Sequence, residues 1–280
     1  MNYENTHIMI LLNKQEIKTE TFPNKETKIK DFDGIIQKDN LIQFTYQEDG
    51  DLIRLMFVKY RLDEEKANCK LLINYMPYSR MDRRIEGDLF TLKYTCRLIN
   101  SLNFDEVFVV EPHSHKTIEL LHNSVAVYPA MKWLPRIMAE MKFTENDRIV
   151  FPDKGAAARY ADCEYENVCI FEKTRNAATG RIENMVLKEG SLPQGARCII
   201  VDDLCSAGGT FHWAGSILKE MGADDITLMI THCEQSIFSG KLLEADSPID
   251  RIYTSNSMMN DQHLKLNYIT LNTEELCANQ

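Results

Sequence analysis

The stretch CIIVDDLCSAGGTF, residues 198–211, decides how the rest of the chain is interpreted. It joins an apolar run to two adjacent carboxylates, Asp202 and Asp203, and then to a turn of small residues. Small residues let a backbone approach a ligand closely, and Gly208 and Gly209 can adopt positive φ without steric cost. Where such a turn opens a helix, its backbone N–H groups form a site for a phosphate. We therefore interpret the stretch as a phosphate-binding turn beside a carboxylate pair.

The carboxylates need a partner other than the phosphate, because Asp202 and Asp203 would repel it. Vicinal sugar hydroxyls suit them, as does a Mg²⁺ ion held beside a phosphate. Ser206 and Thr210 can add hydroxyl donors to the turn. A phosphate at one end and hydroxyls at the other describe a ribose 5-phosphate unit. The alternative is a strand that ends in two solvated aspartates and an ordinary turn.

The same stretch resembles the phosphoribosyl-diphosphate (PRPP) loop of type I phosphoribosyltransferases and PRPP synthetases. In that pattern two apolar and two acidic residues precede a Ser/Thr-Gly-Gly-Thr-like turn. The chain departs from it at Ala207, where the family commonly has a threonine. The resemblance implies a ribose-phosphate site made by Asp153, Asp202, Asp203, Cys205, Ser206, Ala207, Gly208, Gly209 and Thr210.

Length, composition and charge limit the class of protein. The chain has 280 residues, of which 44% are hydrophobic and 26% charged, which is typical of a soluble globular protein with room for two domains. Its net charge of −10 argues against a broad electrostatic footprint for nucleic acid. The first residues lack a basic region, and no apolar stretch approaches the ~20 residues of a membrane span. We expect a cytoplasmic protein with no nucleic-acid or membrane partner.

The cysteines do not indicate a metal or redox motif. Eight cysteines are scattered singly, and no Cys-x-x-Cys occurs. Several lie inside apolar runs, where a free cysteine behaves as a small hydrophobic residue.

Short apolar runs alternate with amphipathic stretches, which predicts βαβ units and a mostly parallel sheet. We predict an α/β fold of two phosphoribosyltransferase-like domains, residues 1–132 and 133–280. The candidate strands are His7–Leu12, Cys69–Tyr75, Glu106–Glu111, Asp147–Phe151, Val168–Glu172, Arg197–Val201, Asp225–Thr231 and Arg251–Thr254. The candidate helices are roughly Asp88–Leu102, His115–Leu121, Trp133–Lys142, Gly155–Asp162 and Phe211–Met221.

A wider set of segments resembles the PRPP synthetases, in order, from the N-terminus to about residue 260. Ligands of such sheets bind beyond the carboxyl ends of the strands, and the polar segments fall there. Met81 replaces a usual glutamine, and Glu111-Pro112 replaces a usual Asp-Leu. The matching segments are FPNKETKI (22–29), PYSRMDRR (77–84), VVEPHSH (109–115), FPDKGAAARYA (151–161), FEKTRN (171–176), THCEQSIFSGKLLE (231–244) and RIYTSNS (251–257).

The resemblance implies a diphosphoryl transfer. The anomeric hydroxyl of a ribose attacks the β-phosphorus of ATP, and AMP leaves. Such transfers are catalysed mainly by positioning and by neutralising charge. Lys173 and Arg175 are the implied catalytic residues, and their alternation along a strand predicts that both project to one side. His113 and Asp153 are the implied ligands of a Mg²⁺ ion that bridges ATP phosphates.

The resemblance also implies how ATP is held. Phe22 stacks on adenine and Glu26 hydrogen-bonds to it from a segment that reaches into a neighbouring subunit. We therefore expect a homo-oligomer whose ATP sites are shared between subunits. The implied ATP-binding residues are Phe22, Asn24, Glu26, Arg80, Asp82 and His113.

The acceptor and two competing functions stay open at the level of sequence. Ala207 removes a hydroxyl donor and vacates space beside the phosphate, so a 5-extended ribose such as ADP-ribose competes with ribose 5-phosphate as acceptor. A phosphoribosyltransferase that consumes PRPP needs only one such domain. A non-catalytic, PRPP-synthetase-like regulatory partner would not need Lys173, Arg175 and His113.

Overall fold

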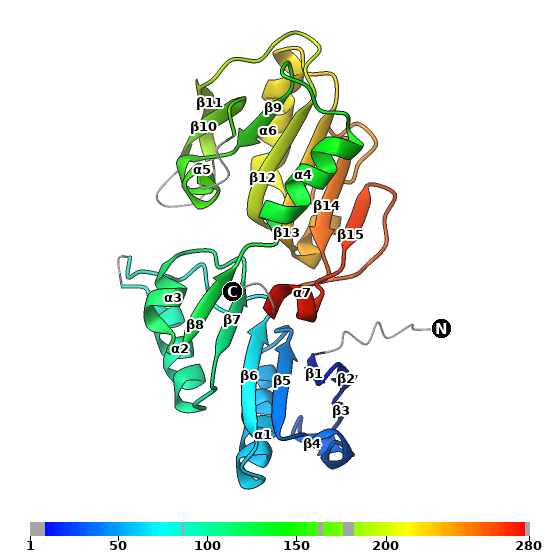
Figure 1. Ribbon diagram of the computed structural model, residues 1–280. Coiled ribbons are helices and arrows are strands. Elements are labelled where there is room, and N and C mark those ends of the chain that lie inside the picture. Colours follow the sequence, from blue (N-terminus) through cyan, green and yellow to red (C-terminus); the bar gives the residue numbers. More distant parts are fainter. Residues whose placement is uncertain (1–8, 86, 162–164, 176–181, 278–280) are drawn as a thin grey trace. The chain divides into compact units, whose positions relative to one another are not determined.

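The computed structural model describes residues 9–85, 87–161, 165–175 and 182–277, and the chain forms two compact units (Figure 1). The first unit is Met1–Tyr128 together with Leu271–Gln280, and the second is Pro129–Thr270. The boundary predicted from the sequence lies four residues later, and that prediction assigns the whole C-terminal segment to the second domain. That segment joins the first unit because Thr273 donates a 2.7 Å hydrogen bond to Gln43 Oε1 and Leu276 is buried.

The first unit contains a mixed sheet in the order β2-β1-β5-β6-β7-β8. Strands β5 to β8 run parallel, whereas β1 is antiparallel to both of its neighbours. A separate two-stranded hairpin is formed by β3 and β4. The bounds are β1 (Ile10–Leu12), β2 (Gln15–Glu16), β3 (Lys18–Thr21), β4 (Thr27–Lys30), β5 (Asp39–Phe44), β6 (Asn68–Ile73), β7 (Val107–Val110) and β8 (Ser124–Val127).

Helices α1 (Gly50–Glu64) and α2 (Thr91–Ser101) cover one face of this sheet. On α1, apolar side chains recur at helical spacing and pack on the core that includes the alternate side chains of β6 and β7. The buried Asp51 fixes the start of α1, since its carboxylate accepts the N–H groups of Gln47 and Glu48 at 2.8 and 2.9 Å. The sequence prediction missed both α1 and β5. Short helices α3 (Lys116–Leu120) and α7 (Thr273–Cys277) complete the unit.

The second unit contains a larger sheet in the order β11-β10-β9-β12-β13-β14-β15. All neighbouring strands are parallel except β10 and β11. The strand order reverses between β9 and β12, and ligands of such sheets bind beyond the carboxyl ends at that point. The bounds are β9 (Arg148–Phe151), β10 (Val168–Arg175), β11 (Ile182–Glu189), β12 (Cys198–Cys205), β13 (Ile226–Cys233), β14 (Arg251–Ser255) and β15 (Leu266–Ile269).

Helices lie on both faces of this sheet (Figure 1). Helix α6 (Gly209–Glu220) covers one face of the sheet. Its Phe211, Ala214 and Leu218 pack in the same core as the side chains of β12 and β13. Helix α4 (Ala130–Glu140) lies on the other face, and the short α5 (Lys154–Arg159) follows β9. The predicted α/β class with mostly parallel sheets is confirmed. No helix among the described residues is long and apolar enough to cross a membrane.

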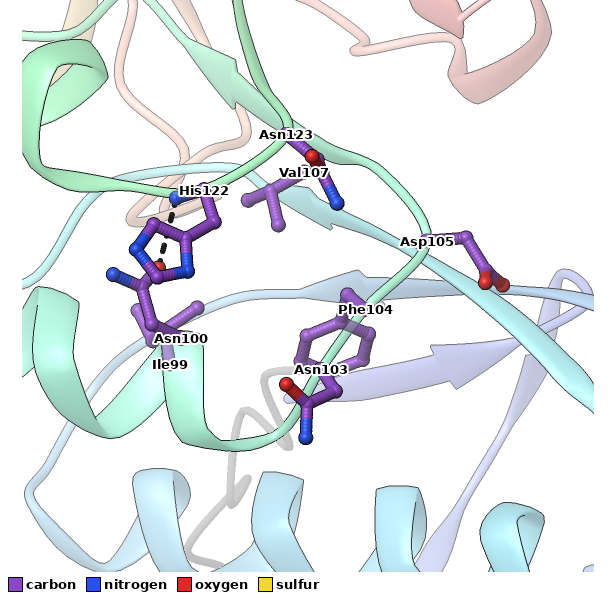
Figure 2. Close-up of a pocket in the computed structure, with 8 residues that line it drawn as sticks. All are labelled: Ile99, Asn100, Asn103, Phe104, Asp105, Val107, His122 and Asn123. Carbon is purple, nitrogen blue, oxygen red and sulfur yellow. Dashed lines mark hydrogen bonds between the residues drawn. The ribbon is translucent and has the colours of Figure 1, made fainter.

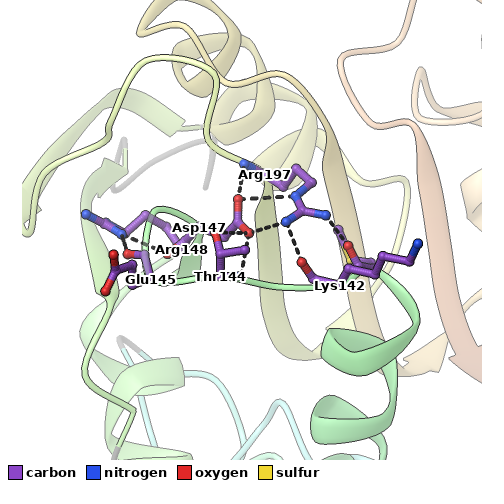
Figure 3. Close-up of polar contacts among 7 residues, drawn as sticks. Lys142, Thr144, Glu145, Asp147, Arg148 and Arg197 are labelled. Carbon is purple, nitrogen blue, oxygen red and sulfur yellow. Dashed lines mark hydrogen bonds and ion pairs between the residues drawn. The ribbon is translucent and has the colours of Figure 1, made fainter.

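An ion pair between a buried aspartate and a half-buried arginine ties α4 to the amino ends of β9 and β12 (Figure 3). The carboxylate of Asp147 accepts hydrogen bonds from the backbone and side chain of Thr144 and from the backbone and guanidinium of Arg197. The same guanidinium also donates to the backbone carbonyls of Met141 and Lys142, just after α4. These bonds satisfy helix-end carbonyls that would otherwise lack partners. The cluster is therefore structural and lies at the edge opposite to the carboxyl ends.

The first unit has a hollow of about 320 Å³ at the amino-end edge of its sheet (Figure 2). It is lined by residues that precede or begin β7 and β8, so it faces away from the edge at which ligands of parallel sheets bind. The lining residues are Ile99, Asn100, Asn103, Phe104, Asp105, Val107, His122 and Asn123.

Candidate active site

The second unit brings a carboxylate and an amine together at the tips of two neighbouring strands. Asp153 follows β9 and caps α5, because its Oδ1 accepts the N–H of Ala156 at 2.9 Å. Its Oδ2 forms an ion pair with Lys173 Nζ on β10. Burial by itself raises the pKa of Asp153, but the ion pair outweighs burial and the pKa is lowered. A charged carboxylate and a charged amine are therefore held at this point.

The paired aspartates are engaged by an arginine that sequence reasoning missed. Arg159, the last residue of α5, forms ion pairs with Asp202 Oδ1 at 3.0 Å and with Asp203 Oδ1 at 2.9 Å. Burial and the neighbouring Asp203 raise the pKa of Asp202, so one cation serves two crowded carboxylates. The signal was the arginine in GAAARYA, six residues beyond Asp153. The alternative prediction of two solvated aspartates is wrong, since both side chains are largely buried.

The boundaries of the phosphate-binding turn differ from the prediction at both ends. Strand β12 runs to Cys205, so the two aspartates lie in the strand and not in the loop. Helix α6 begins at Gly209, which leaves a three-residue loop, Ser206–Gly208. Gly208 has φ of 84°, and a Cβ there would lie 2.2 Å from Leu242 Cδ1, so only glycine fits.

The turn presents backbone donors as expected for a phosphate site. The first intrahelical N–H of α6 is that of His212, which donates to Gly208 O at 2.9 Å. The N–H groups of the preceding turn, Gly209–Phe211, thus point out of the helix start. Thr210 lies in that first turn and Ala207 is exposed. This geometry can accept an anion, and it lies at the point where the strand order reverses.

A second segment, Glu234–Leu242, lies against this loop, and we refer to it as the brace. Successive residues of the brace contact successive residues of the loop. Glu234 N–H donates to Cys205 O at 2.8 Å, and Ser206 and Ser236 share a 3.0 Å hydroxyl contact. Gly240 packs so closely on Ala207 that a Cβ at Gly240 would lie 1.9 Å from the Ala207 carbonyl oxygen. The sequence placed this segment after the loop but gave it no role.

Only part of the expected catalytic pair can be placed. Strand β10 continues past the predicted end and includes Lys173. The pairing of β10 with β11 shifts register between Thr174 and Arg175, so the simple alternation behind the same-side prediction is interrupted. The side chain of Arg175 lies outside the described residues.

In the first unit, the residues expected to bind adenine lie on an exposed hairpin. Phe22, Asn24 and Glu26 form the tip between β3 and β4. Phe22 N–H donates to Glu26 O at 2.8 Å, and Glu26 N–H donates to Asn24 Oδ1 at 3.2 Å. The Phe22 side chain is 50% exposed, so it is not a core residue of its own unit.

The other expected ATP-binding residues follow the strands β6 and β7. Arg80 is exposed, and Asp82 forms a 3.3 Å ion pair with Arg83. His113 is half-buried two residues beyond Glu111, which is itself buried with φ of 43°. Within the first unit these residues lie at the carboxyl ends of their strands, as the sequence predicts.

The side chains around Asp153 suit a metal ion that is coordinated mainly by its substrate and by water. Among the described residues no group of three or more His, Cys, Asp or Glu side chains gathers at one point. Mg²⁺ commonly uses one or two protein carboxylates and completes its shell with substrate phosphates and water. The Asp153 carboxylate, kept charged by Lys173, fits that use. It does not form a closed, all-protein metal site.

Comparison with known proteins assigns the family. A ribose-phosphate pyrophosphokinase of Pyrococcus abyssi is 32% identical over 201 residues, which cover 69% of this chain and 67% of that protein. One from Sulfolobus acidocaldarius is 29% identical and covers 88% and 86%. The chain belongs to the ribose-phosphate pyrophosphokinase family. It is therefore a transferase-type enzyme. No protein-family model matches.

The pyrophosphokinase fold is also supported by a solved structure. A phosphoribosylpyrophosphate synthetase from Mycobacterium smegmatis matches with a TM-score of 0.72 at 18% identity, and covers 91% of this chain and 85% of that one. At that identity the likeness concerns the fold. It extends over both units, which argues against a protein built from a single phosphoribosyltransferase domain.

Proposed function

We propose that the protein is an ATP-dependent diphosphotransferase that moves the β,γ-diphosphoryl group of ATP to the anomeric hydroxyl of a ribose carrying a 5-phosphoryl group. The observation that carries the proposal is the arrangement at β9 and β12. A phosphate-binding helix start follows a carboxylate pair, and a lysine–aspartate pair lies on the neighbouring strands. The phosphoryl group of the acceptor occupies the Ser206–Thr210 turn, and Asp202 and Asp203 bind its ribose hydroxyls.

In this proposal Lys173 is the catalytic cation. Its amine forms an ion pair with Asp153, and the Lys173 side chain is 17% exposed at the sheet edge. Charge develops on the transferred group and on the departing AMP, and a fixed cation stabilises it without reorganisation. Arg175 shares this role from the end of β10, where a guanidinium suits several phosphate oxygens at once.

ATP binds through the first unit. Phe22 stacks on the adenine of a neighbouring subunit's ATP, while Asn24 and Glu26 hydrogen-bond to it. Arg80, Asp82 and His113 contact the rest of the nucleotide. The exposure of Phe22 supports this role, because an exposed aromatic side chain at a hairpin tip has no packing function in its own unit. The active form is then a homo-oligomer.

A Mg²⁺ ion would accompany ATP. In the second unit the Asp153 carboxylate would be its ligand, and in the first unit His113 stays the predicted one. When bound, it neutralises phosphate charge, which is the chemistry that such an ion supplies. Lys173 keeps the Asp153 carboxylate ionised and oriented for this purpose.

The acceptor is ribose 5-phosphate or a 5-extended ribose such as ADP-ribose. The names of the relatives, ribose-phosphate pyrophosphokinase, favour the former. The exposed Ala207 favours the latter, since it supplies no hydroxyl donor and leaves space beside the phosphate. Measuring kcat/KM for both acceptors in parallel decides between them.

One assay tests the function itself. Purified protein, Mg²⁺ and ATP are mixed with each acceptor, and AMP is measured by chromatography. We expect AMP in amounts equal to a ribosyl 1-diphosphate product. If PRPP is instead consumed with a nucleobase, the chain is a phosphoribosyltransferase. If AMP forms with neither acceptor under any oligomeric condition, the diphosphotransferase proposal is wrong and a regulatory role is favoured.

A further inference from the structure

One arginine side chain connects the two consecutive aspartates of β12. Arg159 Nη1 lies 3.0 Å from Asp202 Oδ1 and 2.9 Å from Asp203 Oδ1, and the Asp203 N–H donates to Asp202 Oδ1 at 2.9 Å. Consecutive side chains of a strand ordinarily point to opposite faces of the sheet. Because both carboxylates contact the same nitrogen, the guanidinium holds them at one point near the end of β12.

The guanidinium is itself fixed by its surroundings. Its Cζ lies 6.0 Å from the centroid of the Tyr160 ring, and this buried ring stacks on Phe151 at 5.9 Å. Arg159 ends the short helix α5, whose start is capped by Asp153. Only 11% of the Arg159 side chain is exposed, so dissolved salt screens its ion pairs weakly.

The position of the guanidinium bears on the two partners that the sequence left open for the carboxylate pair, sugar hydroxyls and Mg²⁺. A cation that bridged the two Oδ1 atoms would have to displace Arg159. A sugar hydroxyl needs only a lone pair, and an ionised carboxylate that accepts one donor still has lone pairs for others. The arginine is therefore compatible with hydroxyls but competes with a cation.

The charge of these three side chains matters for the turn that follows them. Two ionised aspartates would repel a phosphate bound in the turn, which begins at Ser206. The guanidinium sets one positive charge against the two negative charges, which leaves a formal charge of −1. A phosphate beside the pair is then repelled less than by two uncompensated carboxylates.

We propose that Arg159 is a positioning residue that serves as the built-in counter-ion of Asp202 and Asp203. The pair then accepts ribose hydroxyls beside the bound phosphate and does not recruit a divalent cation. This rests on the proposed function, in which the turn binds the phosphoryl group of the acceptor substrate. The second unit is thereby left with Asp153, and not the pair, as the carboxylate for a metal ion.

The affinity for inorganic phosphate tests the charge balance, measured by isothermal titration calorimetry at pH 8. Arg159→Gln increases the negative charge beside the turn and should weaken phosphate binding about tenfold, whereas Asp203→Asn decreases it and should strengthen binding about tenfold. The double variant restores the wild-type charge and should bind phosphate within about threefold of wild type. A purely structural role of Arg159 would instead make the double variant the weakest binder.

Binding of Mn²⁺ alone, without nucleotide, tests the counter-ion role. Carboxylate sites that suit Mg²⁺ also suit Mn²⁺, which is counted by electron paramagnetic resonance. Arg159→Gln should bind one more Mn²⁺ than wild type, because two uncompensated carboxylates then lie together, and adding Asp203→Asn should abolish that site. Arg159→Lys retains the charge and should bind no additional Mn²⁺. Absence of the additional Mn²⁺ in Arg159→Gln overturns the counter-ion role.

Lys154→Gln is the matched control for the loss of a positive charge from α5. The Lys154 side chain is 65% exposed and lies 4.0 Å from Glu172 Oε1. Because exposed ion pairs contribute little, phosphate and Mn²⁺ binding should stay within about twofold of wild type. An effect as large as that of Arg159→Gln would overturn a specific role of Arg159.

These outcomes are separate from the proposed function, because the binding assays need no turnover. The expected order of phosphate affinities supports the charge balance even if no AMP is ever formed. Unchanged affinity in Arg159→Gln, or a weaker affinity still in the double variant, overturns it even if wild-type protein produces AMP. If Arg159→Gln does not fold, Asp203→Asn decides, since tighter phosphate binding supports the charge balance and unchanged or weaker binding overturns it. If wild-type protein binds neither inorganic phosphate nor ribose 5-phosphate, both proposals are overturned.

Discussion

The two units present their candidate ligand-binding residues differently. In the second unit the charged side chains described above at the edge have partners within the unit. Lys173 is paired with Asp153, and Arg159 with Asp202 and Asp203. In the first unit the tip of the β3–β4 hairpin exposes Phe22 and its neighbours to solvent.

In the proposed function this difference separates two ways of preparing a binding residue. Groups that act on developing charge must be fixed and partly desolvated before the substrate arrives, which the second unit achieves through ion pairs. A flat adenine ring needs an aromatic surface that is uncovered until it binds, as the hairpin tip provides. We therefore expect substitutions in the second unit to change the chemistry or the stability, and substitutions at the hairpin to change ATP affinity.

Lys173→Ala should have the largest effect. Losing a fixed cation at the reacting group is expected to lower kcat by about 10³-fold, as for removal of a single charge-stabilising donor in other enzymes. KM for the acceptor should change little, because the turn at Ser206–Thr210 is untouched. Steady-state rates of AMP formation measure both. Arg175→Ala should have a similar effect, since both side chains are proposed to act on the same phosphate oxygens.

The control for this prediction is Lys188→Ala. Lys188 lies on the neighbouring β11 and pairs with the exposed Glu172 at 3.7 Å, away from Asp153. The Lys188→Ala substitution removes the same charge from the same sheet. It should leave kcat within about twofold of the wild-type value, because exposed ion pairs contribute little. Near-normal kcat in Lys173→Ala would contradict the catalytic role of β10.

The second unit should also lose stability when its structural ion pair is broken. Asp147→Asn removes the charge that Arg197 and Thr144 bind in Figure 3 and should lower the free energy of unfolding by about 2 kcal/mol at pH 7. Burial opposes ionisation, but these donors outweigh it, so the pKa of Asp147 is lowered. Its contribution is therefore complete above the unfolded pKa of about 3.9 and is lost as pH falls through the folded pKa.

The stability measurement can be restricted to this unit. Both tryptophans, Trp133 and Trp213, belong to it, so urea unfolding followed by their fluorescence reports on the second unit. Glu145→Gln is the matched control, since it neutralises an exposed carboxylate in the same loop. The difference between Asp147→Asn and wild type should shrink below pH 4. A constant difference at all pH values would show that lost packing, and not lost charge, is responsible.

The sequence predicted the second unit better than the first for a physical reason. Strands β9, β12 and β13 are buried on both faces and have continuous apolar runs, which are easily located. Helix α1 carries Asp51, Arg54 and Lys59 in buried positions, so its apolar pattern is interrupted by charges whose pairing appears only in three dimensions.

The candidate site shows the same limit. Motif order located Asp153, Lys173 and the turn, because each follows a strand that the apolar pattern reveals. Arg159 and the brace residues Glu234 and Ser236 were missed as site residues. Their importance depends on which side chains they meet, and those partners are 43 and 30 residues away in the chain. Spacing along one sequence does not encode such contacts.

Phe22→Ala should produce the smallest effect and the most specific one. Base–aromatic stacking contributes about 1–3 kcal/mol, so KM for ATP should rise about tenfold. Stability should not change, because the side chain is half exposed and is not part of the core of its unit. Pro23→Ala alters the same tip without removing an aromatic ring and is the control. An unchanged KM for ATP would remove Phe22 from the nucleotide site.

Mixing variants tests whether Phe22 serves a neighbouring subunit. Lys173→Ala protein lacks the catalytic cation but retains Phe22, and Phe22→Ala protein has the reverse defect. If the site is shared, co-refolded oligomers contain sites with both residues intact, about a quarter of the total for random association in a closed assembly. High-affinity ATP turnover should then appear in the mixture although neither variant shows it alone. If both residues act within one subunit, mixing produces no such sites, because every chain carries one defect.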